Sequence, residues 1–385
     1  MPRTPVLITL LLPACLALLP TPAHASPKAA RRATPGVTVT RLTWHGWPNS
    51  LRLTNGVVEA IVVPTIGRIT SFRLIGHPET DPIFNNKDWA GKTVADADPT
   101  TWATFGGDKL WPSPQSDWPR HNVRGWPPDQ AFDGDPENAQ TLSDGVRLTT
   151  PDSTAFAARA IRTITMKPGE ARLYVAQTLI KDPDASNPIG STEALLRDTA
   201  NTDAKPDPAA VEAQNAAARQ RRDGFPIGIW SITQTRGDGT IFLPLAPSDK
   251  SPLGFVSLGD AGATYPAPYF TTQADLLRVT RDPKNPHKVG TAAPEGWIAS
   301  LYGGSVLFSE HFTYERGAEY PDSGSAAEAY TNAGPAYIEM ELLGPLTPLT
   351  HGGKIAHDVY WQLQHLPRVP KSRADAGLLV KAAMR

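Results

Sequence analysis

Leu51-Arg-Leu-Thr-Asn-Gly-Val-Val-Glu-Ala-Ile-Val-Val63 is the stretch that decides the fold class of this 385-residue chain. Apolar and polar residues alternate before Asn55-Gly56, and an apolar, largely β-branched run follows. This pattern predicts two strands joined by a tight turn, with positive φ at both turn residues. Gly67 then precedes a further strand, at residues 69–74. The mature chain therefore opens as an antiparallel hairpin that continues into a third strand.

Short strands separated by turn residues recur along the rest of the chain. We expect them at residues 146–149, 155–166, 171–180, 228–235, 240–245, 297–301, 305–314, 336–343 and 357–365. This density of strands, without alternating helices, predicts an all-β fold, a large antiparallel β-sandwich. One short helix is expected within residues 207–224, where Asp207 caps it and Pro208 suits its first turn. Its alanine-rich faces bury little, so residues 182–224 are interpreted as a surface insertion.

The N-terminus has the pattern of a secretory signal. Arg3 precedes an apolar run over residues 6–19, and Ala23-His-Ala25 resembles a cleavage site. We therefore expect export to the periplasm or the extracellular space. No later run reaches about 18 apolar residues, so no membrane span is expected. The expected organisation is a signal peptide at 1–25, a linker at 26–44, a β domain at 45–366 and a C-terminal tail at 367–385.

Composition and missing motifs exclude several classes of function. Cys15, the only cysteine, lies within the signal, in a poor match to a lipoprotein box, so we expect neither a lipid anchor nor a disulfide in the mature chain. The formal net charge is −1, and no basic run suggests nucleic acid. The chain has no phosphate loop, no serine-hydrolase elbow and no zinc-protease helix. Its nine histidines lack metal-ligand spacing, so neither a metal nor a cofactor is expected.

The tract Phe105-Gly-Gly-Asp-Lys-Leu-Trp-Pro-Ser-Pro-Gln115 lies in the most tryptophan-dense part of the sequence. We interpret it as a loop within a long irregular region, residues 75–144. Polar groups for hydrogen bonds and flat indoles for stacking suit a sugar, and the alternative is a stiff loop whose tryptophans fill the core. The candidate binding residues here are Asp108, Lys109, Trp111, Gln115 and Trp118.

Two strands carry candidate acid and base groups. Tyr337-Ile-Glu-Met-Glu-Leu-Leu343 places Glu339 and Glu341 on one face, because side chains alternate along a strand. Two close carboxylates raise the pKa of one of them, which suits a general acid or base; the alternative is two solvated acids. In the second strand Glu310 and His311 are adjacent, so only one of them faces a cleft. His311 is the candidate proton donor, and His121 is the alternative.

Three segments, in order, resemble the galactose-mutarotase-like superfamily. They are residues 57–74, the tract 105–115 and the closing segment 338–363. The form of the tract is similar to an exported bacterial branch of that superfamily. The resemblance implies a supersandwich fold and a carbohydrate ligand.

The resemblance also implies roles for individual residues. Glu339 or Glu341 falls where the family keeps its base, and Lys109 falls near a sugar-binding arginine. Trp230 or Gln234 stands in place of the family's acid histidine, so both are candidate binding residues. Three functions remain open: an epimerase-like isomerase, a non-catalytic sugar-binding protein and a structural β-sandwich of the envelope.

Overall fold

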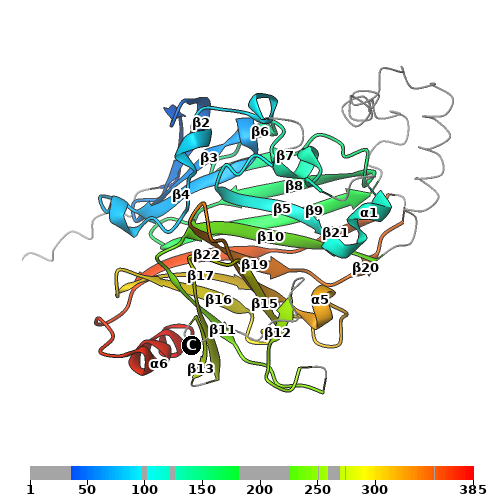
Figure 1. Cartoon of the computed structure of the whole chain (residues 1–385). Helices are drawn as coiled ribbons and strands as arrows, with labels where there is room; N and C mark the ends of the chain where they lie inside the picture. The colour runs from blue at the N-terminus through cyan, green and yellow to red at the C-terminus, as the bar shows by residue number, and fades with distance from the viewer. Residues whose placement is uncertain are drawn as a thin grey trace, which may run out of the picture. The chain divides into compact units, whose positions relative to one another are not determined.

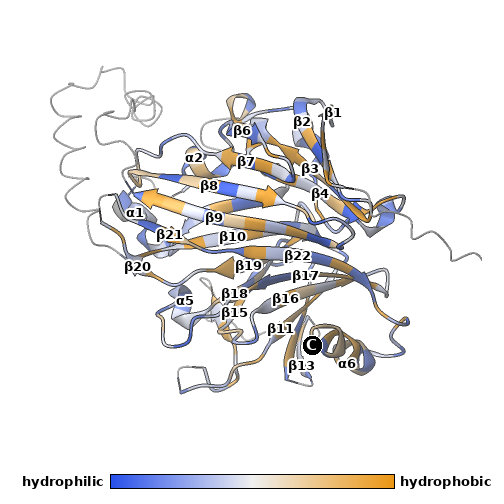
Figure 2. Cartoon of the chain, turned by 180° about the vertical axis from the view of Figure 1, so that it is seen from behind, coloured by the Kyte–Doolittle hydropathy of each residue, from blue (hydrophilic) through white to orange (hydrophobic). Residues whose placement is uncertain are grey.

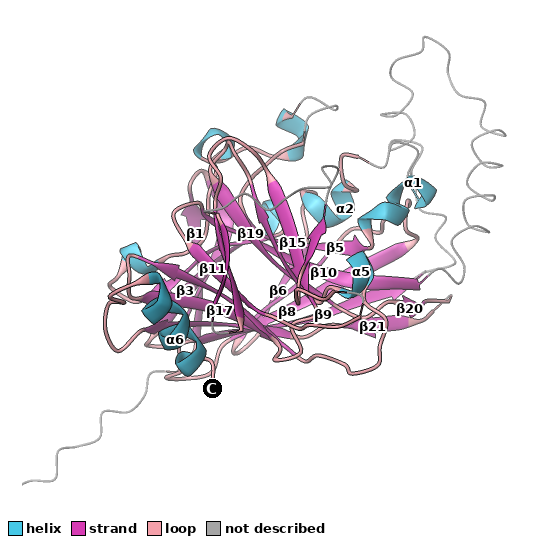
Figure 3. Cartoon of the chain, turned by 60° about the horizontal axis from the view of Figure 1, so that its bottom comes forward, coloured by secondary structure: helices cyan, strands magenta, loops and turns pink. Residues whose placement is uncertain are grey.

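The computed structural model describes residues 36–97, 102–121, 126–181, 226–249, 251–258, 269–273, 275–350 and 352–385. Strands predominate in these residues, and the helices are few and short (Figure 3). The strands pair antiparallel in three sheets. The predicted class, an all-β antiparallel fold, is therefore confirmed. The expected signal at 1–25 and the expected insertion at 182–224 lie outside the described residues.

The first sheet is a meander of four strands. In order it contains β1 (Thr38–Trp44), β2 (Trp47–Thr54), β3 (Val58–Val63) and β4 (Arg68–Leu74). The predicted hairpin is β2 and β3, but only Gly56 of the two turn residues has a positive φ, 89°. The Asn55 side chain stabilises the turn instead, because its oxygen accepts the N–H groups of Val57 and Val58 at 3.0 Å.

The largest sheet has eleven strands (Figure 1). Its order is β13 (Phe270–Gln273), β14 (Leu276–Thr280), β11 (Thr240–Pro244), β16 (Trp297–Tyr302), β17 (Val306–Phe312), β22 (Val359–His365), β9 (Arg172–Lys181), β8 (Ala158–Thr165), β7 (Gly145–Thr149) and β6 (Asn138–Thr141), with β21 (Lys354–Ala356) paired to β9. Along β8 every second residue is buried, and Figure 2 shows mixed blue and orange along β8 and β9. This alternation is the one expected of a strand with one face toward the core.

The third sheet has seven strands. Its order is β12 (Val256–Leu258), β15 (His287–Thr291), β18 (Ala327–Thr331), β19 (Tyr337–Leu343), β10 (Pro226–Arg236) and β20 (Thr347–Pro348), with β5 (Gly107–Ser113) also paired to β10. One face of β19 carries Ile338, Met340 and Leu342, which pack in the main hydrophobic cluster together with residues of the other sheets, such as Phe308 and Trp361. The opposite face of β19 carries Glu339 and Glu341.

Strand β5 corrects the expectation of a loop at residues 105–115. Residues 230–234 of β10 pair with β19 on one side and with β5 on the other, and β5 has no second partner among the described strands, so it lies at an edge. An edge strand tolerates proline, and this explains why Pro112 does not break it. Gly107 has φ 74°, and a Cβ there would lie 2.7 Å from the Ile69 carbonyl oxygen. Glycine therefore lets β5 begin close against β4.

Two further expectations are wrong at their boundaries. β1 lies inside the segment assigned to a linker, because Val39 and Leu42 are partly buried against the core. The segment assigned to a C-terminal tail contains α6 (Arg373–Ala383), capped by the Ser372 hydroxyl. Ala376 and Val380 of α6, four residues apart, pack in a separate cluster that also contains residues of β11, β14, β16 and β17.

The remaining helices are single turns. They are η1 (Pro64–Ile66), η2 (Pro78–Thr80), η3 (Lys87–Trp89), η4 (Val94–Asp96), η5 (Gln115–Asp117), α1 (Trp118–His121), α2 (Gln130–Asp133) and α5 (Pro321–Gly324). Among the described helices, none combines the length and apolar character needed to cross a membrane.

Candidate functional site

Five neighbouring strands of the seven-stranded sheet place polar side chains on one face. Residues directly opposite each other on paired strands share a face. Gln234 is opposite Glu339, and Ile232 is opposite both Lys109 and Glu341. On the far side of β19, Glu328 of β18 is opposite Glu341. Lys288 of β15 is opposite Tyr330 of β18, and Tyr330 is opposite Glu339, so Lys288 lies on the same face. We refer to the ionisable side chains of this face as the charged row: Lys109, Glu339, Glu341, Glu328 and Lys288.

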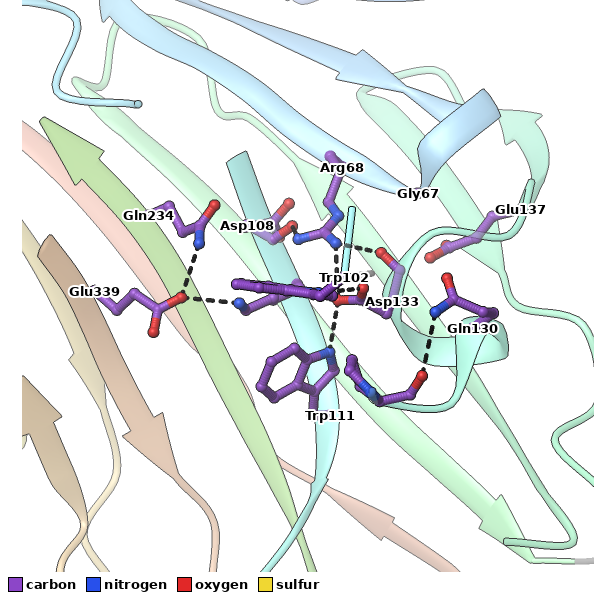
Figure 4. A network of polar contacts seen from close by, with 12 residues as sticks. Gly67, Arg68, Trp102, Asp108, Trp111, Gln130, Asp133, Glu137, Gln234 and Glu339 are labelled. Carbon is purple, nitrogen blue, oxygen red and sulfur yellow. Dashed lines mark hydrogen bonds and ion pairs between the residues drawn. The ribbon is translucent and has the colours of Figure 1, made fainter. Parts of the chain in front are cut away.

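Glu339 is held by two donors, one from the adjacent strand β10 and one from β5, the strand beyond it. Its Oε1 accepts hydrogen bonds from Lys109 Nζ at 2.8 Å and from Gln234 Nε2 at 2.9 Å (Figure 4). The side chains of Lys109 and Glu339 are only 1% and 9% exposed. Burial lowers the pKa of Lys109, and the Glu339 carboxylate opposes that shift. The ion pair is therefore a buried one, in which each charge depends on the other.

Lys109 is also enclosed by indoles. Its Nζ lies 4.0 Å from the ring centroid of Trp111 and 4.4 Å from that of Trp102. An ammonium over an indole face is attracted by the ring quadrupole, more strongly where water is excluded. Both indole N–H groups donate to Asp133 of α2, Trp102 at 2.7 Å and Trp111 at 3.0 Å (Figure 4). Asp133 therefore fixes the orientation of the two rings that surround the ammonium.

These rings belong to a larger group of tryptophans. The Trp cluster consists of Trp102, Trp111, Trp118, Trp126 and Trp230, whose contacting rings have centroids 5.3–6.5 Å apart. Trp111 contacts all four others. Trp126 is 42% exposed and stacks on Trp118 with nearly parallel planes. The cluster thus extends from the charged row to the protein surface.

The other half of the charged row has two carboxyl groups around one ammonium. Lys288 Nζ lies 2.7 Å from Glu328 Oε2 and 3.0 Å from Glu341 Oε2. Trp230 Nε1 donates to Glu341 at 2.8 Å, and its ring lies 4.2 Å from the Lys288 ammonium. Burial raises the pKa of both Glu328 and Glu341. Burial acts against the charged form of Lys288, yet the two carboxyl groups beside it raise its pKa.

The structure brings seven of the ten sequence-predicted residues to this face or its cluster: Glu339, Glu341, Lys109, Trp111, Trp118, Trp230 and Gln234. Trp230 and Gln234, the two alternatives for the position of the family's histidine, each donate a hydrogen bond to a carboxyl group, Trp230 to Glu341 and Gln234 to Glu339.

The other three predicted residues lie elsewhere. Asp108 points to the opposite face of β5, where it accepts from Arg162 at 2.8 Å. Gln115 is exposed in η5. His311, on β17 of the eleven-stranded sheet, stacks on Tyr360 at 4.4 Å. Burial and, to a smaller extent, Arg172 lower the pKa of His311 to about 4, so its imidazole is neutral at physiological pH.

Sequence reasoning missed several residues of this face. Neither Lys288 nor Glu328 is among the residues expected from the sequence. The signal for Glu328 is the alternation in Ala327-Glu-Ala-Tyr-Thr331, which is typical of a strand with one polar face. Asp133 carries no such signal, because its role depends on where α2 is placed. Within the described ranges, no three His, Cys, Asp or Glu side chains are grouped as metal ligands.

No protein-family model matches the chain, and no curated protein matches it. Among solved structures, it is similar to a galactose mutarotase-like protein from Lactobacillus casei ATCC 334, at 9% identity and a TM-score of 0.49, over 82% of this chain and 100% of that one. It is also similar to a putative mutarotase from Salmonella typhimurium, at 9% identity and a TM-score of 0.48, over 86% and 97% of the two chains. A putative aldose 1-epimerase from Escherichia coli K12 shares 10% identity at a TM-score of 0.45, over 86% and 100%. At these values the likeness says nothing about the activity of this chain.

Proposed function

We propose that the protein binds a carbohydrate against the charged row and the Trp cluster, and that it interconverts the anomers of an aldose. The observation that carries the proposal is the carboxylate of Glu339, buried beside indoles and held by Lys109 and Gln234. Indoles stack on the C–H face of a sugar, and charged and amide groups bind its hydroxyls. The sequence resemblance to galactose-mutarotase-like proteins supports the same reading.

Glu339 is the base in this proposal. Both donors meet Oε1, and no hydrogen bond formed among the described residues ends on Oε2. Oε2 is therefore the oxygen that takes the proton of the anomeric hydroxyl. Lys109 and Gln234 position the carboxylate, and Asp133 holds the two indoles around Lys109. A positioned general base contributes roughly 10²–10⁴-fold to the rate.

Replacing Glu339 by Gln tests this role. Anomer interconversion is followed by polarimetry on freshly dissolved single anomers of a panel of aldoses. Glu339→Gln should reduce the rate roughly 10²–10⁴-fold with little loss of sugar affinity. The matched control is Glu310→Gln, which changes a buried carboxyl group on β17 and should leave the rate unchanged.

A second function is favoured by a separate observation, the half-exposed ring of Trp126 that continues the Trp cluster to the surface. An exposed indole of this kind is a stacking platform for a sugar in a non-catalytic binding protein. In that case no aldose is interconverted, and Trp126→Ala weakens sugar binding measured by tryptophan fluorescence. A panel of mono- and oligosaccharides with neither turnover nor a fluorescence change would remove both functions.

We also propose that the protein acts outside the cytoplasm, on the strength of the signal pattern at residues 1–25. N-terminal sequencing of the exported protein should find Ser26 as the first residue. A mature chain that begins at Met1 would contradict this proposal.

A further inference from the structure

The isomerisation proposed above needs a proton donor as well as a base, and the charged row contains more carboxyl groups than ammonium groups. Glu339 is paired with Lys109. Glu328 and Glu341, from adjacent strands, are opposite each other and share the single ammonium of Lys288. Both carboxyl groups are almost fully buried. A buried carboxylate without its own counter-charge is unfavourable, and binding a proton relieves it.

The surroundings of the pair favour that proton. Glu339 on β19 and Asp322 on α5 add negative charge near it, and Tyr330 on β18 is also close. Among the described residues, the indole N–H of Trp230 is the one other group besides Lys288 that donates to the pair, and it donates to Glu341. Neither oxygen of Glu328 has a hydrogen-bond partner of normal geometry among the described residues, and a carboxyl group can donate a hydrogen bond only when it is protonated.

We propose that Glu328 and Glu341 share one proton, and that this pair is the proton donor of the isomerisation, in place of a histidine. This inference rests on the proposed function. Glu339 and Glu341 are two residues apart on one face of β19, about 7 Å along the strand. With a hydrogen bond of about 2.8 Å from each carboxyl group, one group reaches the hydroxyl oxygen of the anomeric carbon and the other reaches the ring oxygen bound to the same carbon.

The proton transfers balance. Glu339 takes the proton of the anomeric hydroxyl, and the pair gives its proton to the ring oxygen. The bond between the anomeric carbon and the ring oxygen breaks, and an open-chain aldehyde forms. Closure on the other face of the aldehyde reverses both transfers, so no oxidant, reductant or co-reactant is needed.

The first test is the pH dependence of the rate, measured by polarimetry with the best aldose of the panel. Glu328→Gln leaves Glu341 alone with Lys288 as a simple ion pair, so the shared proton is lost. The rate should fall roughly 10²–10⁴-fold. Lys288→Met has the opposite effect. Without the ammonium, the two carboxyl groups hold their shared proton more tightly. The alkaline limb of the pH–rate profile should then move to higher pH, a change that a merely structural role would not produce.

The outcomes separate the two proposals. A wild-type rate and an unchanged alkaline limb in Glu328→Gln would overturn the donor role and leave the proposed function standing. Failure of the wild-type protein to interconvert any aldose would overturn the proposed function, and the donor role with it.

The second test measures the proton itself and needs no turnover. Infrared spectra at pH 7 detect the carbonyl band of a protonated carboxyl group. All proteins carry Glu310→Gln, because burial raises the pKa of Glu310 to about 8 and its own protonated carboxyl band would be present at pH 7. The parent should show a protonated carboxyl band that Glu328→Gln lacks. Glu341→Gln serves as the second variant if the first is poorly folded, and no difference in either variant would overturn the shared proton.

Discussion

Glu339 and Glu310 are both buried carboxyl groups in β strands, but they differ in the hydrogen-bond donors that surround them. Glu339 accepts hydrogen bonds from the amide of Gln234 on the adjacent strand β10 and from Lys109 on β5, the strand beyond it. Glu310 is 0% exposed, and neither of its oxygens has a hydrogen-bond partner of normal geometry among the described residues. Burial raises the pKa of Glu310 to about 8, and the Thr233 hydroxyl lowers it to a smaller extent. The surroundings of Glu339 therefore stabilise a charged carboxylate, and those of Glu310 do not.

Lys109→Met should give the largest effect on stability, because it removes the counter-charge of a buried carboxylate. Truncating one partner of a buried pair costs about 3–5 kcal/mol, and chemical unfolding at pH 7 measures the loss. The double variant with Glu339→Gln removes both charges and should recover a good part of it. A loss below about 1 kcal/mol in the single variant would mean that Glu339 does not depend on Lys109, and the contrast with Glu310 would disappear.

Glu310→Gln should act in the opposite direction and stabilise the protein near neutral pH. Because the pKa of Glu310 is raised from 4.5 to about 8, the folded state binds its proton more tightly than the unfolded state does. Stability is therefore lost as the pH rises from about 4.5 to about 8, by roughly 1.4 kcal/mol per pH unit. Near pH 7 the variant should be more stable by about 3 kcal/mol, and near pH 4.5 the two proteins should be equal. Equal stability at both pH values would show that Glu310 has a partner after all.

His311→Ala should have the smallest effect. The imidazole is neutral at physiological pH and stacks on Tyr360, a contact of about 0.5–1.5 kcal/mol. Stability should fall by about 1 kcal/mol, and the rate of anomer interconversion should not change. A rate loss comparable to that of Glu339→Gln would restore His311 as the proton donor and remove Glu328 and Glu341 from that role.

Sequence alone predicts well which face of a strand a side chain occupies, but predicts poorly which residues that side chain contacts. The alternation in residues 337–343 places Glu339 and Glu341 together on the face opposite the core, as the structure shows. Lys109 comes from 230 residues away, and only the pairing of β5 with β10 brings it to Glu339. The glycines and prolines of the tract 105–115 suggested a loop, because no local pattern reveals that β10 has a free edge for it.

Lys288 and the helix α6 could not be predicted from the sequence for a related reason. Lys288 lies on the short strand β15, and its relation to Glu328 and Glu341 is set by the register of three strands. The sequence does not reveal the helix α6, because most of its apolar residues are alanines and its packing against β strands is a tertiary property.

Among the described strands β5 pairs with β10 alone, and its adjacent residues Asp108 and Lys109 carry opposite charges on opposite faces. Asp108 meets Arg162 on one side, and Lys109 meets Glu339 on the other. A slip of one residue would exchange the two faces, setting a carboxylate against Glu339 and an ammonium against Arg162. The order of two adjacent residues therefore disfavours a misaligned β5, because that register would place like charges together on both faces of the strand.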